Sequence, residues 1–276
     1  MTNLDLRKAF NAVSEVVVNR PEALREFDQI YMKISDMLLH AELVSRWVDG
    51  KNLVFLGDGD AIGLTLTYLK ACDVLGRGPA HVHILDFDER IVNSVLRFAE
   101  RFGLEHLITA ELYNVADPLP EQHRSAFEAF HINPPFGASN EGRSVEAFLR
   151  RGDEAVGKDG VGCIVIADDP SLVWTRTVSR QVQKYLLNNG LLIAELVPNF
   201  QHYHLDDKPD LTSCSIIAVR HGSAGMKSSS QPLLAHDLEN FYGKHSPLNV
   251  HYIRDHRAGG KFPSKDYHCE PLQPGG

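Results

Sequence analysis

The sequence predicts an α/β fold with a Rossmann-like, mostly parallel sheet, and three observations carry this prediction. A short apolar run at 53–56 stops on Gly57 and is followed by an amphipathic segment from Ile62, which is typical of the first strand, turn and helix of a nucleotide-binding sheet. Further strand-like runs alternate with helical patterns and end on polar residues. The 276 residues are 43% hydrophobic, enough to fill the core of one α/β domain with small appendages.

The expected organisation has three parts. Residues 1–48 form a helical N-terminal segment, because apolar residues recur at helical spacing on both sides of a break at Pro21. Residues 49–220 form the Rossmann-like catalytic domain. Residues 221–276 form a C-terminal extension rich in Gly, Ser, Pro and charged residues, and we expect a flexible tail from about Arg257.

Bulk composition excludes several classes of function. No apolar run is long enough to span a bilayer and residues 1–20 lack a signal-peptide core, so we expect a soluble, cytoplasmic protein with no membrane partner. The four cysteines form no CxxC pair, which indicates reduced thiols. The net charge of −8 argues against a nucleic-acid partner, because binding phosphates requires a basic face, and it suits a cationic substrate.

The first predicted strand is followed by the loop Gly57-Asp58-Gly59-Asp60. Its glycines allow a tight turn against a ligand, but the GxGxxG pattern that cradles a pyrophosphate is absent and the two carboxylates would repel phosphate. We therefore expect the loop to bind S-adenosylmethionine or its decarboxylated form, through the sulfonium and amino groups, rather than NAD or ATP. A turn that only caps the next helix is the alternative.

The next two strands supply further candidates for cofactor binding. The strand at 80–89 contains Asp86 and Asp88, and an acid at this place takes both ribose hydroxyls of adenosine ligands. We favour Asp86 for the ribose, and expect one of the two acids to cap the following helix. Asn114, directly after the third strand at 108–113, is a candidate partner of the adenine amino group or a turn residue.

The motif Asn133-Pro134-Pro135-Phe136 follows the fourth strand, at 127–132. The prolines remove two backbone donors and hold Asn133 extended, so its side chain is aimed. In nucleotide-dependent enzymes that alkylate amines, such a turn lets the carboxamide oxygen and the carbonyl before the second proline accept hydrogen bonds from the substrate nitrogen, and the aromatic ring walls the pocket. An ordinary strand-to-loop turn is the alternative, but polar residues at three strand ends favour function.

Two later segments contain candidates for substrate binding. Asp168 and Asp169 end the fifth strand, where they would line an amine pocket or cap the next segment. Tyr203 and His204 lie in a run of aromatic residues, histidines and acids at 200–207, and are candidates for a polar wall facing the substrate. The two histidines of that run lack the spacing of a third and fourth ligand, so we expect no metal.

The order of motifs along the chain carries a resemblance to a known family. The motifs lie at 27–29, 56–60, 85–88, 113–120, 134–135, 148–152 and 211–215, and span residues 27–220. In this order and spacing they resemble the branched-chain polyamine synthases, the N4-bis(aminopropyl)spermidine synthases. The resemblance implies a class I methyltransferase-like domain that binds decarboxylated S-adenosylmethionine and adds aminopropyl groups to a secondary amine of spermidine. It places Gly57, Asp58 and Asp60 in the cofactor motif and Asp86 at the ribose.

Two departures from the family pattern bear on function. Gly59 interrupts a run of three acids, and Asn133 stands where family members carry an Asp that is thought to receive the proton or hold the attacking amine. An amide can orient an amine but cannot act as a base. The acidic loop nevertheless favours the decarboxylated cofactor, because that form has no carboxylate to be repelled.

We therefore expect alkyl transfer, of an aminopropyl group in the first place, to a polyamine-like amine such as spermidine. S-adenosylmethionine-dependent N-methyl transfer is the first alternative, and a non-catalytic protein that binds a nucleoside or polyamine is the second. A homodimer is expected by analogy with other Rossmann-type transferases that have helical N-terminal arms.

Overall fold

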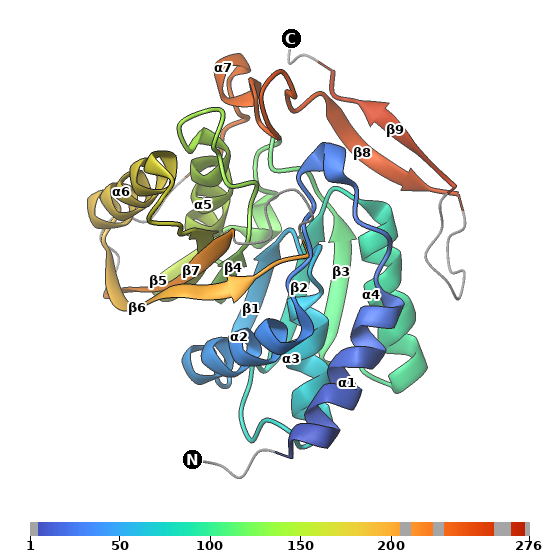
Figure 1. The fold of residues 1–276 in the computed structure, drawn as a ribbon. Coiled ribbons are helices and arrows are strands. Elements are labelled where there is room, and N and C mark those ends of the chain that lie inside the picture. Colours follow the sequence, from blue (N-terminus) through green and yellow to red (C-terminus); the bar gives the residue numbers. More distant parts are fainter. Residues whose placement is uncertain (1–4, 205–210, 223–228, 257–265, 274–276) are drawn as a thin grey trace.

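The computed structural model describes residues 5–204, 211–222, 229–256 and 266–273 (Figure 1). Its main feature is a seven-stranded sheet in the order β3-β2-β1-β4-β5-β7-β6. The strands are β1 Asn52–Leu56, β2 His81–Asp86, β3 Ile108–Leu112, β4 Phe127–Ile132, β5 Val156–Ala167, β6 Leu191–His202 and β7 Thr212–Arg220. Only β7 runs antiparallel to its neighbours within this sheet, so the predicted mostly parallel α/β fold is confirmed.

Helices cover both faces of the sheet, in three layers (Figure 1). On one face lie α1 Leu6–Asn19, α2 Ile34–Trp47, α3 Ile62–Ala71 and α4 Glu89–Phe102, and on the other α5 Arg143–Ala155 and α6 Val173–Asn188. Parallel strands covered on both sides are expected to be apolar throughout. In β1, Leu53 and Phe55 pack into one core while Val54 and Leu56 pack into the other, and all four are buried.

The C-terminal extension forms structure of its own. The short helix α7, Ala235–Leu238, is followed by a two-stranded antiparallel sheet of β8 Val250–Asp255 and β9 Tyr267–Pro271. The backbone N–H of Ile253 in β8 donates to the carbonyl of Phe87 over 3.0 Å, beside the start of α4. The predicted flexible tail is therefore wrong for β9, because the strand finds a partner. The predicted tail residues 257–265 and 274–276 lie outside the described residues.

Strand β6 reaches into the run of aromatic residues and histidines at 200–207. It extends from Leu191 to His202 and follows helix α6, which ends at Asn188. Strand β6 is the edge of the sheet and pairs with β7 alone, with two shifts of register. An edge strand keeps one side open to solvent, so it accommodates polar residues such as those of this run. No described helix is long and apolar enough to cross a membrane.

Candidate active site

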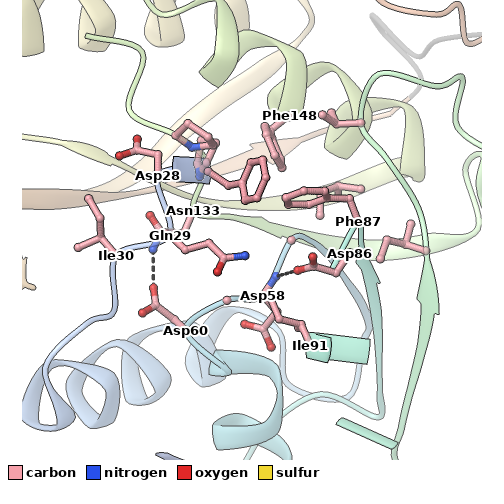
Figure 2. A pocket seen from close by; sticks show the side chains of 18 of the residues that line it. Asp28, Gln29, Ile30, Asp58, Asp60, Asp86, Phe87, Ile91, Asn133 and Phe148 are labelled. Atoms are coloured by element: carbon pink, nitrogen blue, oxygen red, sulfur yellow. Dashed lines mark hydrogen bonds between the residues drawn. The ribbon is translucent and has the colours of Figure 1, made fainter. Parts of the chain in front are cut away.

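A cavity lies at the carboxyl ends of β1, β2 and β4, where open parallel sheets place their ligands (Figure 2). Its empty volume is about 980 Å³, including the part open to solvent. Its walls come from the segment before α2, the loops after β1, β2, β3 and β4, helices α4 and α5, the end of β6, and the C-terminal extension. The lining residues include Phe27, Asp28, Tyr31, Gly57, Asp58, Gly59, Asp60, Asp86, Phe87, Tyr113, Asn114, His131, Asn133, Pro134, Pro135, Phe136, Phe148, Tyr203 and Tyr242.

The loop after β1 turns tightly at Gly57, whose φ is 76°. This left-handed conformation favours glycine, whereas crowding does not, because a β-carbon there would meet the Phe148 ring at an ordinary contact distance of 3.5 Å. The two oxygens of Asp58 accept hydrogen bonds from the backbone N–H groups of Ile62 and Gly63, over 2.8 and 2.9 Å. Asp58 thus lines the cavity and also caps the start of α3, which was the alternative role of this loop. Burial raises its pKa well above the usual value.

Asp86 is the buried carboxyl at the end of β2, in the place predicted for the ribose. Its oxygens accept hydrogen bonds from the backbone N–H groups of Asp58 (2.8 Å) and Asp88 (2.9 Å). Burial, assisted by the negative charge of Asp88, raises the pKa of Asp86 from 3.8 to about 7. The side chain is therefore held in place by two fixed donors and is poised to titrate near neutral pH.

Asp88 does not line the cavity, so the structure lends no support to its prediction as a cofactor-binding residue. Its carboxylate is fully buried, forms an ion pair with Arg90 over 2.5 Å, and accepts a hydrogen bond from the Arg90 backbone N–H at the start of α4. Gln29 donates to the same carboxylate over 3.1 Å. Asp88 directly precedes α4, and its side chain caps the first turn of this helix. This was the alternative role.

Asn114 lines the cavity, but its polar atoms bond to backbone. Its Nδ2 donates to the carbonyls of Val250 (3.1 Å) and His251 (2.6 Å), and its Oδ1 accepts from the N–H of Ala116 (2.8 Å). The side chain therefore ties β8 to the end of β3, as a turn residue would. Contact with an adenine amino group stays a prediction.

The predicted Asn133-Pro134-Pro135-Phe136 turn lies in the cavity wall. The Nδ2 of Asn133 donates to Oδ2 of Asp60 over 2.7 Å, as Figure 2 shows with a dashed line. The Oδ1 of Asp60 accepts from the backbone N–H of Met32 over 2.6 Å, and burial raises the pKa of this carboxyl. The hydrogen bond to Asp60 thereby orients the carboxamide of Asn133.

A chain of buried polar groups extends from this turn under the cavity. Tyr203 packs against Phe136 of the turn, and its hydroxyl lies 2.8 Å from that of Ser213, which in turn donates to Gln201 over 2.6 Å. Gln201 approaches His40 at 3.0 Å, and the Nε2 atoms of His40 and His131 are 2.8 Å apart. Burial lowers the pKa of His40 to about 3 and that of His131 well below its usual value. Both rings are neutral, so the network positions groups without adding charge.

Of the four residues predicted to bind substrate, only Tyr203 lines the cavity. Asp169 accepts two hydrogen bonds from Ser171, over 2.8 Å from N–H and 2.6 Å from Oγ, and Asp168 accepts one from the N–H of Asn199 over 2.9 Å. Both predictions are therefore corrected in favour of local turn contacts, because β5 delivers these acids to the turn before α6. His204 also lies outside the lining, and its backbone N–H donates to Tyr31.

Several lining residues were not predicted. Phe27, Asp28 and Tyr31 come from the segment between α1 and α2, and Tyr242 comes from the C-terminal extension. The ring of Tyr242 packs edge-on against Phe27, with centroids 5.4 Å apart, so the segment before α2 and the C-terminal extension meet at the cavity. The only signal in the sequence was the motif at 27–29, which contributed to the family resemblance but carried no local indication of a site.

Comparison with known proteins adds three findings. The sequence profile of the branched-chain polyamine synthase A C-terminal domain matches residues 8–258. A Thermus thermophilus N(4)-bis(aminopropyl)spermidine synthase is 33% identical over 67% of this chain and 50% of its own length. The corresponding Methanocaldococcus jannaschii synthase is 27% identical over 68% of this chain and 51% of its own length. The chain thus spans about half the length of these curated relatives.

Solved structures agree with this relationship. A branched-chain polyamine synthase mutein from Thermus thermophilus, in complex with N4-aminopropylspermidine and 5′-methylthioadenosine, superposes with a TM-score of 0.71 at 26% identity, covering 88% of this chain and 71% of that one. A putative RNA methyltransferase from Pyrococcus horikoshii reaches a TM-score of 0.57 at 16% identity, over 78% of this chain and 99% of that one, which shows a shared fold alone.

Proposed function

The chain belongs to the branched-chain polyamine synthase family, and from this premise we propose that it transfers an aminopropyl group from decarboxylated S-adenosylmethionine to an amine nitrogen of a polyamine. Spermidine is the first acceptor to test, because curated relatives are named N(4)-bis(aminopropyl)spermidine synthases. The cofactor class has support from the Thermus structure, which contains 5′-methylthioadenosine, the thioether that aminopropyl transfer would leave. A cytoplasmic location and a homodimer stay predictions.

One observation carries the proposal: the cavity wall presents carboxyl groups, whose ionised forms a bound cation would stabilise, and no Lys or Arg among its described residues. Four carboxyl groups line it, those of Asp28, Asp58, Asp60 and Asp86, and no lysine or arginine is among the lining residues of the described chain. Decarboxylated S-adenosylmethionine and a polyamine are both cationic and carry no carboxylate. The methionine carboxylate of S-adenosylmethionine would enter an acidic site with no facing cation, which costs free energy.

The residues fit a nucleoside at one end of the cavity. In Figure 2, Asp86 and Phe87 lie toward one side of the view, while Asp28 and Asp60 lie toward the other. The rings of Phe87, Phe148 and Tyr242 give the Asp86 end flat apolar surfaces suited to an adenine base. Asp86, fixed by its two backbone donors, would accept hydrogen bonds from the ribose hydroxyls.

At the other end, Asn133 would orient the attacking amine. Its Nδ2 is committed to Asp60, so its Oδ1, which has two lone pairs, is the atom that would face an amine N–H. The Pro134 carbonyl would be a second acceptor, and Phe136 and Tyr203 would exclude water around them. The two rings pack edge to face with centroids 5.8 Å apart, which fixes the shape of this wall.

Asp60 would take the proton that the amine loses. An amide cannot accept it, and Asp60 is the carboxyl in direct contact with Asn133. Because burial raises the pKa of Asp60, its protonated form is more accessible than that of an ordinary aspartate. The sulfonium co-substrate supplies an electrophilic carbon and a neutral thioether leaving group, so most of the rate acceleration would come from positioning.

N-methyl transfer is the second candidate, and the amide at position 133 favours it, because the Asn-Pro-Pro-Phe motif itself would hold an amine without supplying a base. The methionine carboxylate would then require a cation. Arg20 is a buried one close to the site, but its guanidinium lies over the Tyr31 ring, 4.3 Å from the centroid, and donates to the Asp60 carbonyl over 3.1 Å. These contacts hold Arg20 outside the cavity lining.

The test is calorimetric binding of S-adenosylmethionine and of its decarboxylated form, each with and without spermidine, followed by mass spectrometry of the products. We expect tighter binding of the decarboxylated form, further tightened by spermidine, and a product heavier by one or two aminopropyl groups. Preference for the carboxylated form with methylated products would establish the second candidate. Binding without turnover for any sulfonium and amine pair would instead indicate the non-catalytic alternative.

A further inference from the structure

Two histidines and a glutamate meet on the sheet outside the cavity. His83 lies on β2, Glu111 on β3 and His123 at the end of the short 3-10 helix Glu121–His123. Glu111 pairs with Leu85 in the parallel register, and His83, two residues before Leu85, therefore points to the same face of the sheet. None of the three lines the cavity, so their arrangement is not accounted for by the proposed reaction.

Their polar atoms converge on one point. The Nε2 of His83 lies 3.4 Å from Oε1 of Glu111, and the Nε2 of His123 contacts the same oxygen. One possible ligand atom from each residue lies within 4.8 Å of the others. The histidine side chains are 14% and 10% exposed and that of Glu111 is 43% exposed, so the cluster is partly shielded and can be reached from solvent.

The surroundings prepare His83 to act as a ligand. Its Nδ1 lies 2.8 Å from the hydroxyl of Thr109, which leaves Nε2 directed at the cluster. That Nε2 is buried and has no hydrogen-bond partner. A metal-binding histidine characteristically uses its other ring nitrogen in such an outer contact, which fixes the ring. The ring of Phe127 stacks on both histidines, with centroids 5.8 and 5.9 Å away.

The geometry brings acceptor atoms together. The Nε2 of His83 has no hydrogen-bond partner within the described residues, although it lies 3.4 Å from Oε1 of Glu111. In the tautomer that donates from Nδ1 to Thr109, Nε2 presents a lone pair to this carboxylate oxygen, and two acceptors repel each other. A cation between them would satisfy both groups, as well as the nitrogen of His123.

We propose that His83, Glu111 and His123 bind a divalent cation of the Zn²⁺ class. Two imidazoles and one carboxylate are a ligand set that suits Zn²⁺ and its first-row neighbours, and a fourth position would remain for water. The cation would join β2 and the edge strand β3 to the turn that contains His123. It would act as a clamp on the sheet, with no role in the transfer reaction.

The first test uses chelator-treated full-length protein titrated with Co²⁺, followed by visible absorption, and with Zn²⁺, followed by calorimetry. We expect one equivalent to bind. The variants His83→Ala, His123→Ala and Glu111→Gln should each weaken binding by more than about tenfold. The matched control is His81→Ala, because His81 lies two residues earlier on the same strand, near Thr109, and supplies no atom to the cluster.

A second pair of histidines must be removed, because cation binding there would be confused with binding at the proposed site. His256 and His268, on the β8 and β9 side, have ring nitrogens 3.0 Å apart and are exposed, so they would also attract a divalent cation. The titrations are therefore repeated in a His256→Ala, His268→Ala background. Loss of the bound equivalent in this background, with retention in His83→Ala, would overturn the proposal, as would the absence of binding.

Thermal unfolding gives an independent reading. Zn²⁺ at 100 times its dissociation constant should raise the unfolding temperature of the wild type and of His81→Ala by about 5–10 °C. Zn²⁺ should leave the unfolding temperatures of His83→Ala and Glu111→Gln unchanged. Because Glu111 is the most exposed of the three, its conservative substitution keeps the test valid if a histidine variant fails to fold. Equal shifts in all variants would contradict the assignment.

Discussion

The buried carboxyl groups at the two ends of the cavity differ in their hydrogen-bond partners. At the nucleoside end, Asp86 is held by two backbone N–H donors and faces aromatic rings, and burial raises its pKa to about 7. At the amine end, Asp60 belongs to a network of side chains that includes Asn133, with the Met32 N–H as its other donor. Burial raises the pKa in both cases, but only Asp60 is hydrogen-bonded to a side chain that would orient the amine.

This difference separates binding from chemistry. A carboxyl held by backbone can recognise a fixed pair of hydroxyl groups, because its position does not depend on other side chains. A carboxyl within a side-chain network can exchange a proton with its neighbours and reorient them. We therefore expect changes at Asp86 to alter affinity for the nucleoside, and changes at Asp60 and Asn133 to alter turnover.

The largest effect is expected for Asp60→Asn. The substitution keeps the shape of the side chain but removes the proton acceptor, so kcat should fall by about 100- to 1000-fold. Affinity for 5′-methylthioadenosine, measured by calorimetry, should change little. An equal loss of kcat and of affinity for 5′-methylthioadenosine would mean that the two ends of the cavity do not have separate roles in binding and turnover.

Asn133→Ala should have the next largest effect. Loss of the oriented carboxamide should lower kcat by about 10- to 100-fold, with little change in nucleoside affinity. Asn133→Asp is the informative companion, because it restores the residue that the family resemblance implies at this position. Steady-state kinetics of this variant should show activity retained or increased, and its complete loss would argue against aminopropyl transfer.

Asp86→Ala should weaken binding of 5′-methylthioadenosine by about 1–3 kcal/mol, because charge-assisted hydrogen bonds to the ribose are lost. At saturating co-substrate, kcat should stay near that of the wild type. Calorimetry and kinetics on the same preparation measure both quantities. Unchanged affinity would remove Asp86 from the nucleoside site.

Titration of Asp86 should make nucleoside binding depend on pH. Ionised Asp86 accepts hydrogen bonds best, so affinity should fall as the pH is lowered through about 7, and Asp86→Asn should abolish this dependence. In the ligand-free protein, the free energy of unfolding depends on pH in the opposite direction to nucleoside affinity. The unfolded chain ionises near 3.8 while the folded chain keeps its proton to about 7, so this group lowers the free energy of unfolding as pH rises between these values. Urea unfolding of both proteins at pH 5.5 and 7.5 measures that contribution.

Asp169→Asn should have the smallest effect. Its carboxylate is exposed, bonds only to Ser171 among the contacts described, and lies outside the cavity lining. We expect kcat, KM for spermidine and the free energy of unfolding to stay close to wild type, the last within about 0.5 kcal/mol. A raised KM would show that this acid reaches the substrate during turnover, contrary to its position here.

The sequence by itself determined the sheet and the residues at its strand ends. Apolar runs, a glycine at a left-handed turn and two prolines act locally, so local patterns alone assign Gly57, Asp86 and Asn133 to one edge of the sheet. Such patterns favoured Asp86 over Asp88 for the ribose but left open which of the two acids caps the helix, because both stand beside its start. Only the pairing of Asp88 with Arg90 decided which acid faces the cavity.

Tertiary structure alone decided the contacts between distant segments. Asp60 and Asn133, which share a hydrogen bond, are 73 positions apart in the sequence. Phe27 and Tyr242, whose rings are in contact, are 215 positions apart, and Asn114 bonds to the distant strand β8. The meeting of His83, Glu111 and His123 is of the same kind. No periodicity or spacing records such contacts, because they arise from how the strands order themselves in the sheet and from the side chains that then share a face.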